Sequence, residues 1–435
     1  MLLPPALAHR LSIPSGIHLS NKTRRACEGF KKQIDQYGEQ GRVPEQQASK
    51  GLKKEMERDG EEGVLQQPSV ENMAKLLSLF RTSESGWIKV IDLEGYRGLK
   101  NKHLKGICNK IFQLKYLSLR KTGIAELPKE INKLQDLETF DIRETNIEHF
   151  PAKSIVLPKL GQLLSGGGSS DGYPSHGFTA VEIPRRIGNM TNMQVISHVR
   201  FCDGGEDAAL DLVRLQMLRK LGVIINGKKQ ANILLQVVGM LSECLMSLSI
   251  HVSDTEDVPD LNNTPKIFSP PKSLASLSIS GKIGGLPTWV QNIDQLSDIT
   301  LCETFLRESD INILRALVNL RFIRLLSDSY MKNTLNFDKG FRSLEFLIVQ
   351  GKIISTIHFG HRVAPKLEKI VWSSTCKMEA LEIDELQGIK EIELHGDYDR
   401  DSIRGSIAKN QNNPVLKELN PSFQLRCEWG HGVAT

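Results

Sequence analysis

Three short patterns in the sequence carry residue types that could do chemistry. The first is residues 222–229 (GVIINGKK), which match a phosphate loop except at the last position, where Lys229 replaces the Ser or Thr that binds magnesium. A phosphate loop follows a strand, whereas Leu221, Val223 and Ile224 are themselves expected to lie in a strand. The pattern therefore predicts no nucleotide site.

The second pattern is acidic. Asp397, Asp399 and Asp401 begin like a calcium-binding loop. Ser402 stands where that loop needs a glycine, however, and Ala408 stands where it needs a glutamate that binds the ion through both oxygens. We interpret these residues as a solvated acidic turn.

The third pattern is a histidine pair, His358 and His361, which has no third metal ligand near it in the sequence. The 7 cysteines are scattered and form no C-x-x-C pair, so they indicate neither a zinc site nor a disulfide framework. No Ser-His-Asp or Cys-His set can be assembled from the sequence. We therefore expect no enzymatic activity, no cofactor, no metal and no small-molecule substrate.

The composition limits the remaining classes of function. The 435 residues are 40% hydrophobic and 25% charged, which is typical of a soluble protein with a large core. The net charge of +5 is mild and aromatic residues make up 6%, so we expect no nucleic-acid partner. No apolar run approaches the length of about 18 residues that a membrane-spanning helix needs. The first residues also lack the basic region of a secretory signal.

The elements that would position any functional residue are repeats of the pattern L-x-x-L-x-L, with Ile, Val, Met, Phe or Trp also in the apolar slots. Clear copies open at Leu114, Leu137, Leu274, Leu296, Leu320, Leu344, Leu367 and Ile389, and looser copies open at Ile88, Leu160, Met193, Leu218 and Leu245. The steps from 274 onward are 22, 24, 24, 23 and 22 residues. This pattern and period predict an α/β solenoid, a leucine-rich-repeat horseshoe of about 13 repeats with a concave parallel sheet and an irregular convex side.

Two further signals keep the same register. A proline follows an apolar residue nine positions before the next strand, at Pro128, Pro151, Pro184 and Pro287. Proline lacks an N–H donor, which suits a turn onto the convex side. A threonine stands eight residues after the strand start, at Thr122, Thr145, Thr304 and Thr375. We expect each of these hydroxyls to bond to the backbone of the turn.

Several blocks of the sequence resemble the leucine-rich-repeat region of plant nucleotide-binding disease-resistance proteins, in particular the coiled-coil class of grasses. They include residues 114–151 (LKYLSLRKTGIAELPKEINKLQDLETFDIRETNIEHFP), 183–199 (IPRRIGNMTNMQVISHV) and 268–290 (FSPPKSLASLSISGKIGGLPTWV). In that family a coiled-coil domain and a nucleotide-binding switch precede the repeats. Neither has a counterpart in this sequence.

The resemblance implies a protein-binding module of plant innate immunity. Its partners would be a pathogen effector, a guarded host protein or the nucleotide-binding switch domain, and its location the cytoplasm, or the nucleus and cytoplasm together. The alternative is a stand-alone intracellular repeat scaffold without immune function. The irregular steps of 25 to 33 residues between 160 and 274 argue against the very regular scaffolds of that kind.

We expect the following organisation. Residues 1–86 form an N-terminal segment, in which residues 10–13 resemble a first repeat strand and the polar residues 30–63 are predicted to be disordered, with a coiled coil as the alternative. Residues 87–425 form the repeat domain, interrupted by a flexible Gly/Ser loop at 165–178, and residues 426–435 form a tail.

The candidate binding residues occupy the x positions of the pattern, which should face outward on the concave sheet. They are Lys115, Tyr116, Arg120, Arg143, Arg321, Phe322, Arg324, Glu345, Phe346 and Lys369, and the same register also turns Ser118, Asp141 and Val371 outward. Phe322 and Phe346 share one slot in neighbouring strands, so their side chains should lie about 4.8 Å apart. Two outward aromatics beside arginines fit the composition of protein interfaces. The alternative is a pair that only stabilises the sheet or is covered by a loop.

Overall fold

The computed structural model describes residues 9–12, 88–96, 98–151, 155–167, 180–201, 206–254, 256–266 and 268–419. The predicted disordered stretch 30–63 and the tail 426–435 lie outside these residues, as does most of the predicted Gly/Ser loop 165–178.

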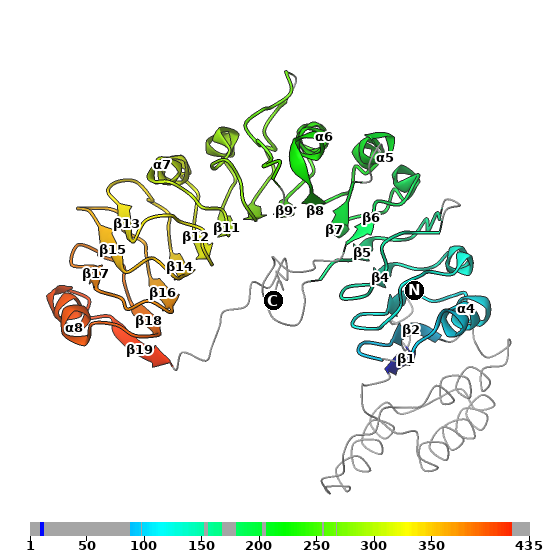
Figure 1. Ribbon diagram of the computed structural model, residues 1–435, viewed down its shortest axis with the longest axis horizontal. Coiled ribbons are helices and arrows are strands. Elements are labelled where there is room, and N and C mark those ends of the chain that lie inside the picture. The colour runs from blue at the N-terminus through cyan, green and yellow to red at the C-terminus, as the bar shows by residue number, and fades with distance from the viewer. Residues whose placement is uncertain are drawn as a thin grey trace, which may run out of the picture.

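The described chain forms an arc with a long parallel sheet on its inner side and helices and loops on its outer side (Figure 1). This sheet has 16 strands, of which β6 pairs only with β7 and the others follow one another along a single path. The strands are β1 (His9–Ser12), β2 (Ile88–Asp92), β3 (Tyr116–Ser118), β4 (Thr139–Asp141), β5 (Gln162–Leu164), β6 (Val181–Glu182), β7 (Val195–Arg200), β8 (Lys220–Ile225), β9 (Ser247–Val252), β10 (Ser276–Ser280), β11 (Asp298–Cys302), β12 (Phe322–Leu326), β14 (Phe346–Gly351), β16 (Lys369–Ser374), β18 (Glu391–His395) and β19 (Val415–Leu419). The predicted horseshoe is confirmed.

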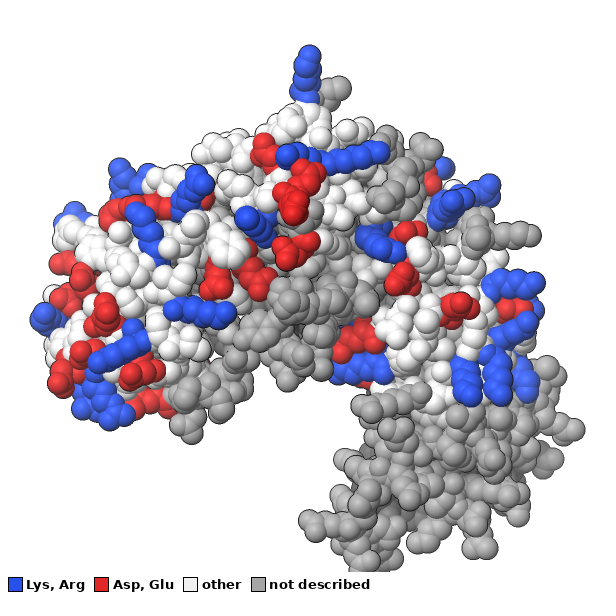
Figure 2. Space-filling model, viewed as in Figure 1, with Lys and Arg blue, Asp and Glu red and all other residues white. Residues whose placement is uncertain are grey.

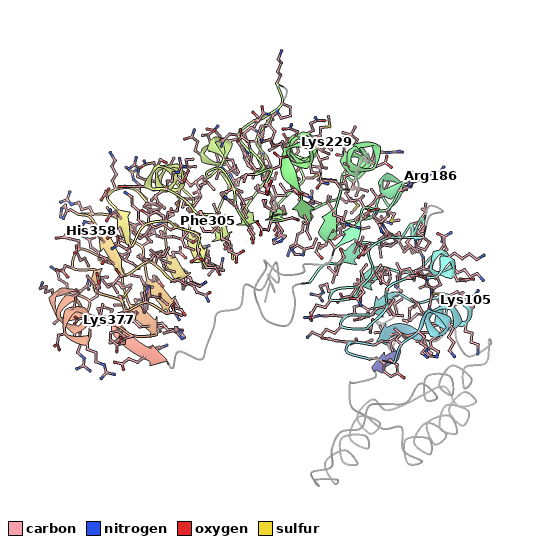
Figure 3. All side chains as sticks on the ribbon, viewed as in Figure 1. Lys105, Arg186, Lys229, Phe305, His358 and Lys377 are labelled. Carbon is pink, nitrogen blue, oxygen red and sulfur yellow. The ribbon has the colours of Figure 1, made fainter. Side chains whose placement is uncertain are left out.

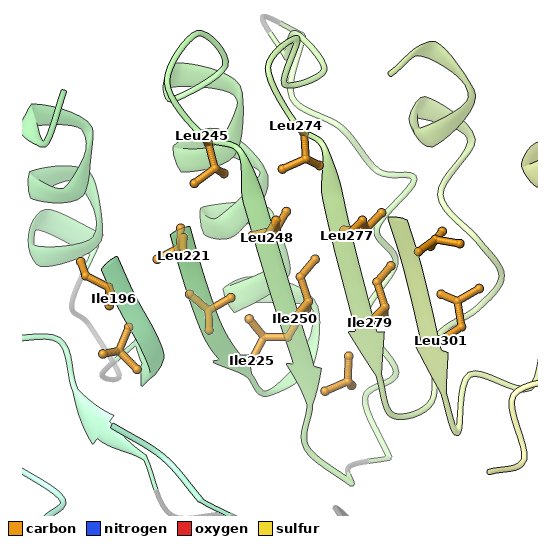
Figure 4. Close-up of a cluster of buried hydrophobic side chains, with 14 of the residues drawn as sticks. Ile196, Leu221, Ile225, Leu245, Leu248, Ile250, Leu274, Leu277, Ile279 and Leu301 are labelled. Carbon is orange, nitrogen blue, oxygen red and sulfur yellow. The ribbon is translucent and has the colours of Figure 1, made fainter. Parts of the chain in front are cut away.

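The apolar slots of the repeat make the core. Each strand turns alternate side chains inward, and parallel pairing in register places the same slot of every repeat side by side, as with Leu248, Leu277 and Ile299. These three side chains are at most 1% exposed, and Figure 4 shows how neighbouring repeats continue the same apolar layer. Burying one such side chain contributes about 1.5–3 kcal/mol, so the stack of repeats, rather than any one repeat, stabilises the fold.

The outer side carries short helices that connect successive strands. They are the α-helices α4 (Asn101–Lys110), α5 (Glu206–Asp211), α6 (Gly227–Met240), α7 (Glu308–Ala316) and α8 (Arg400–Lys409), and the 3-10 helices η2 (Lys129–Lys133), η3 (Ile187–Asn189), η4 (Leu212–Arg214) and η5 (Thr288–Asn292). Pro128 and Pro287 stand directly before η2 and η5, as expected for proline at the turn onto the convex side.

Three repeats near the C-terminal end replace the outer helix by a strand. The strands β13 (Thr334–Phe337), β15 (Thr356–Phe359) and β17 (Ala380–Glu382) form a second parallel sheet on the convex side. Phe337 and Phe359 stack with ring centroids 4.9 Å apart beneath it. We predicted an irregular convex side but not this sheet, although alternation such as Thr334-Leu335-Asn336-Phe337 is a signal that could have indicated it.

Two strands extend the inner path beyond the 13 repeats read from the sequence. β1 overlaps the fragment at residues 10–13 and pairs with β2. β19 was missed because Asn413 and Glu418 occupy two of its three apolar slots, and only Leu416 keeps the pattern.

Candidate protein-binding surface

The predicted binding residues fall into two groups on the inner face of the arc. Lys115, Tyr116, Arg120 and Arg143 belong to the repeats of β3 and β4, and the remaining six residues belong to the repeats of β12, β14 and β16. Pairing of β3 with β4, and of β12 with β14 and β14 with β16, brings the members of each group onto neighbouring strands. Six strands on the path, β5 and β7 to β11, lie between β4 and the second group, so the two groups form separate patches.

The centre of the second group is the aromatic pair. Phe322 and Phe346 are register partners in β12 and β14, and their rings stack with centroids 4.9 Å apart and an interplanar angle of 7°. The predicted adjacency is therefore confirmed. Both side chains are half-buried. The neighbouring residues Ile323 and Leu347 point into the core, so the two rings lie on the opposite side of the strands, on the inner face of the arc.

Two arginines frame this pair. The guanidinium carbons of Arg321 and Arg324 lie 5.5 Å and 5.7 Å from the ring centroid of Phe322, within the range of a cation–π contact. Arg321 also donates to both carboxylate oxygens of Glu345, at 2.9 and 2.6 Å. This hydrogen bonding lowers the pKa of Glu345 and raises the pKa of Arg321. Arg324 lies 3.5 Å from Asp298.

Lys369 is engaged within the sheet. Its ammonium group lies 2.6 Å from Glu391 and 2.7 Å from Glu393, and hydrogen bonds to these carboxylates raise its pKa. Lys417 contacts Glu391 from the next strand at 2.7 Å. The inner face beyond the aromatic pair is thus a network of opposite charges, and a partner would have to compete with it.

The first group is also internally paired. Arg120 donates to Glu144, with N–O distances of 2.8 and 2.9 Å. Arg143 binds both oxygens of Asp141, at 2.9 and 2.5 Å, and this bond raises the pKa of Arg143. Lys115 lies 2.6 Å from Glu138. Figure 2, which views the arc from the side, shows Lys and Arg interspersed with Asp and Glu over the described residues of that face.

Three residues predicted to face a partner are instead covered. Ser118 and Asp141 are each 1% exposed, and Val371 is 5% exposed. Their position in the repeat therefore does not make these side chains accessible to a partner. In the case of Asp141, Arg143 lies across the carboxylate.

The three motifs that could do chemistry have structural roles. Leu221, Val223 and Ile224 lie in β8, as predicted, and Gly227 opens α6. The carboxylate of Asp257 accepts the backbone N–H of Lys228 at 3.0 Å, which lowers the pKa of Asp257. The place where a phosphate loop would hold phosphate therefore already carries an internal carboxylate.

One residue of the histidine pair, His358, and one of the acidic turn, Asp401, line the same convex cleft. Asp399 caps α8 by accepting the N–H of Ser402 at 3.0 Å. His358 pairs with Glu382, and His361 lies 2.7 Å from Glu385. The cleft, of about 580 Å³, is lined by β15, β17 and α8 and includes His358, Glu382 and Asp401; Figure 3 shows His358 on the outer side of the arc. Among the described residues, no group of three or more His, Cys, Asp or Glu could hold a metal ion.

The inner parallel sheet, the outer connections and the array of outward side chains define a leucine-rich-repeat protein. The chain belongs to the family described as "Leucine-rich repeat region", which matches residues 67–409. In the described part of the chain, no helix has the length and apolar character needed to cross a membrane.

The similar curated proteins are disease resistance proteins of rice (Oryza sativa subsp. japonica). Pik-2 is 28% identical over 365 residues, covering 72% of this chain and 35% of Pik-2. PIK6-NP is 30% identical over 344 residues, covering 71% of this chain and 32% of PIK6-NP. The predicted resemblance to plant disease-resistance proteins is confirmed, and the chain spans about a third of the length of these relatives.

Solved structures of similar shape include an internalin, inlF, of Listeria monocytogenes, which is 13% identical with a TM-score of 0.47 and covers 82% of this chain and 94% of the internalin. A leucine-rich-repeat protein of Leptospira interrogans is 15% identical with a TM-score of 0.42, covering 79% of this chain and 98% of its own.

Proposed function

We propose that this chain is a protein-recognition module of plant innate immunity and that its partner contacts the inner face at Phe322 and Phe346. The observation that carries the proposal is the stacked, half-buried aromatic pair, with ring centroids 4.9 Å apart and two arginines against one ring. Aromatic residues and arginine are the types most enriched among the residues that dominate binding energy at protein interfaces.

The immune role is supported by the rice relatives, which are disease resistance proteins. Under this proposal the partner is a pathogen effector, a guarded host protein or a nucleotide-binding switch domain, and binding takes place in the cytoplasm or in both cytoplasm and nucleus. The chain acts by binding and carries out no reaction of its own.

The test is the double substitution Phe322→Ala with Phe346→Ala. Ile323 and Leu347 remain buried beneath the removed rings, so the fold should persist. The natural chain and the double variant would each be immobilised, and the proteins that they retain from grass leaf extract would be identified by quantitative mass spectrometry. The affinity of each retained protein for the natural chain and for the variant would then be measured with purified proteins. If the aromatic pair dominates the interface, its loss should reduce the binding free energy by about 2 kcal/mol or more, which corresponds to a roughly 30-fold weaker Kd.

The matched control is Phe112→Ala with Met240→Ala. These side chains are 50% and 59% exposed and lie after α4 and at the end of α6, away from the inner face. The control should retain the same partners with unchanged affinity. A folded Phe322/Phe346 double variant that binds as tightly as the natural chain would refute the proposal.

A further inference from the structure

The inner face changes character on the N-terminal side of the aromatic pair. The outward residues of β9 and β10 are serines, namely Ser247, Ser249, Ser276 and Ser278. They alternate with buried Leu248, Ile250, Leu277 and Ile279, so they face the hollow of the arc. Their short side chains make a low floor, over which a partner can approach the strands more closely than it can over the charged repeats on either side.

The four serines, here called the serine floor, belong to a row of side chains that runs across neighbouring strands and has different residue types at its two ends. Pairing in register aligns Lys220 of β8 with Ser247, Ser276, Asp298 and finally Phe322 of β12. Four strand spacings separate Lys220 from Phe322, which is about 19 Å at about 4.8 Å per strand. One end of the row is therefore cationic, whereas at the other end Asp298, which lies 3.5 Å from Arg324, stands between the serines and the ring of Phe322.

The cations at the β8 end are available to a partner. Arg219 and Lys220 are both exposed. Arg219 contacts the sulfur of Met246 at 3.8 Å, and within the described part of the chain neither residue forms an ion pair with a carboxylate. Arg321 and Arg324, at the aromatic end, are by contrast paired with Glu345 and Asp298. The unmatched positive charge of this row therefore lies at Arg219 and Lys220.

Taking the proposed function as its basis, we propose that the partner presents a single protein segment that is acidic at one end and aromatic or aliphatic at the other. The acidic end pairs with Arg219 and Lys220, the apolar end packs on Phe322 and Phe346, and the chain between them crosses the serine floor. A separation of about 19 Å matches about 13 residues of α-helix or about six residues of extended chain. Charge at one end and ring contacts at the other also fix the direction in which the segment lies.

The test selects a displayed library of random 16-residue peptides against the purified full chain. Enriched peptides should combine Asp or Glu with a separated Trp, Tyr, Phe or Leu. A labelled selected peptide is then titrated against the natural chain, against Arg219→Ser with Lys220→Ser, and against Phe322→Ala with Phe346→Ala. Exposed ion pairs are individually weak, so the affinity should fall at least about threefold at low ionic strength. The difference should shrink at about 0.5 M salt, because added salt screens these charges.

The matched control is Lys102→Ser with Lys129→Ser, which removes two exposed lysines from α4 and η2 on the convex side. Neither forms an ion pair within the described residues, and the affinity of the peptide should not change. Peptides that require Phe322 and Phe346 but ignore Arg219 and Lys220 would overturn this inference and leave the proposed function standing. Peptides indifferent to both sites would contradict both, and a selection with no enrichment would overturn the inference alone.

Discussion

At the scale of single residues, the repeat register identifies which polar side chains enter the core, but not how each is satisfied. The buried hydroxyls of Thr122 and Thr145 donate to Leu119 and Ile142 three residues back, at 2.6 and 2.7 Å, as expected. Thr304 is also buried but donates across to Ser329 of the next repeat. Such differences depend on the local geometry of each turn, which the spacing of the repeat pattern does not determine.

One threonine prediction was wrong. Thr375 is exposed, and the neighbouring Cys376 thiol takes the corresponding inward position, donating to the carbonyl of Ile354 at 3.4 Å. A thiol can donate to a backbone carbonyl as a hydroxyl does, and here the thiol lies one residue after the predicted threonine. Trp289 and Trp372 both lie in the core, with side chains that are 5% and 0% exposed.

Burial lowers the pKa of His251 from 6.5 to about 4. As the pH falls, the unfolded chain therefore binds the proton first, and stability is lost between pH 6.5 and 4. From pH 7 to pH 4, the unfolding free energy of the natural chain should fall by about 3 kcal/mol because of this histidine. In His251→Gln this part of the fall should be absent. Urea denaturation at the two pH values measures this difference.

The control for that titration is Phe112→Ala, because the side chain of Phe112 is 50% exposed and carries no titratable group. This variant should lose as much stability as the natural chain over the same pH range. An identical loss in the His251 variant would show that the buried imidazole does not carry the pH dependence.

At the scale of elements, the sequence predicts the strands well and their connections less well. A strand buries fixed alternate positions, so the apolar pattern locates β8 or β12 directly. The outer connections need only bring the chain back to the next strand, and helices, 3-10 turns and the β13–β15–β17 sheet all do so. For the binding surface, the shared slot placed Phe322 beside Phe346, whereas the ion pairs that engage Lys369 depend on rotamers that no spacing reveals.

The turn after β10 offers a sharp test of how neighbouring repeats approach one another. Gly281 has a φ of +91°, and a Cβ added there would lie 2.3 Å from the carbonyl oxygen of Val252 on β9. Gly281→Ala should therefore lower the unfolding free energy by about 2 kcal/mol or more, from backbone strain and from the clash between adjacent repeats. The midpoint of urea denaturation reports this change.

Gly284 provides the comparison three residues later, because nothing lies within 4 Å of a Cβ added there. Gly284→Ala should change the stability by no more than about 0.5 kcal/mol. Equal stability of the two variants would mean that β9 and β10 do not approach each other at Gly281 as described.

At the scale of the whole molecule, each repeat contacts its neighbours and together they expose one long curved face. That face is not uniform along the arc: paired charges at β3 and β4 give way to a serine floor at β9 and β10, then to the aromatic pair at β12 and β14, and then to the charge network around Lys369. The sequence predicted the solenoid and its inner face. The order of these zones emerged only once strand pairing had aligned the slots of non-identical repeats.

The measurement that tests the central claim most directly is photo-crosslinking from this face in leaf tissue. Phe346 is replaced by p-benzoylphenylalanine, which keeps an aromatic ring at the position, and Phe112 is replaced in the same way as the comparison. After irradiation, mass spectrometry identifies the proteins joined to each position. We expect a specific partner protein to be joined at position 346 and not at position 112. No adduct at 346, or the same adducts at both positions, would contradict the assignment of the inner aromatic pair as the binding surface.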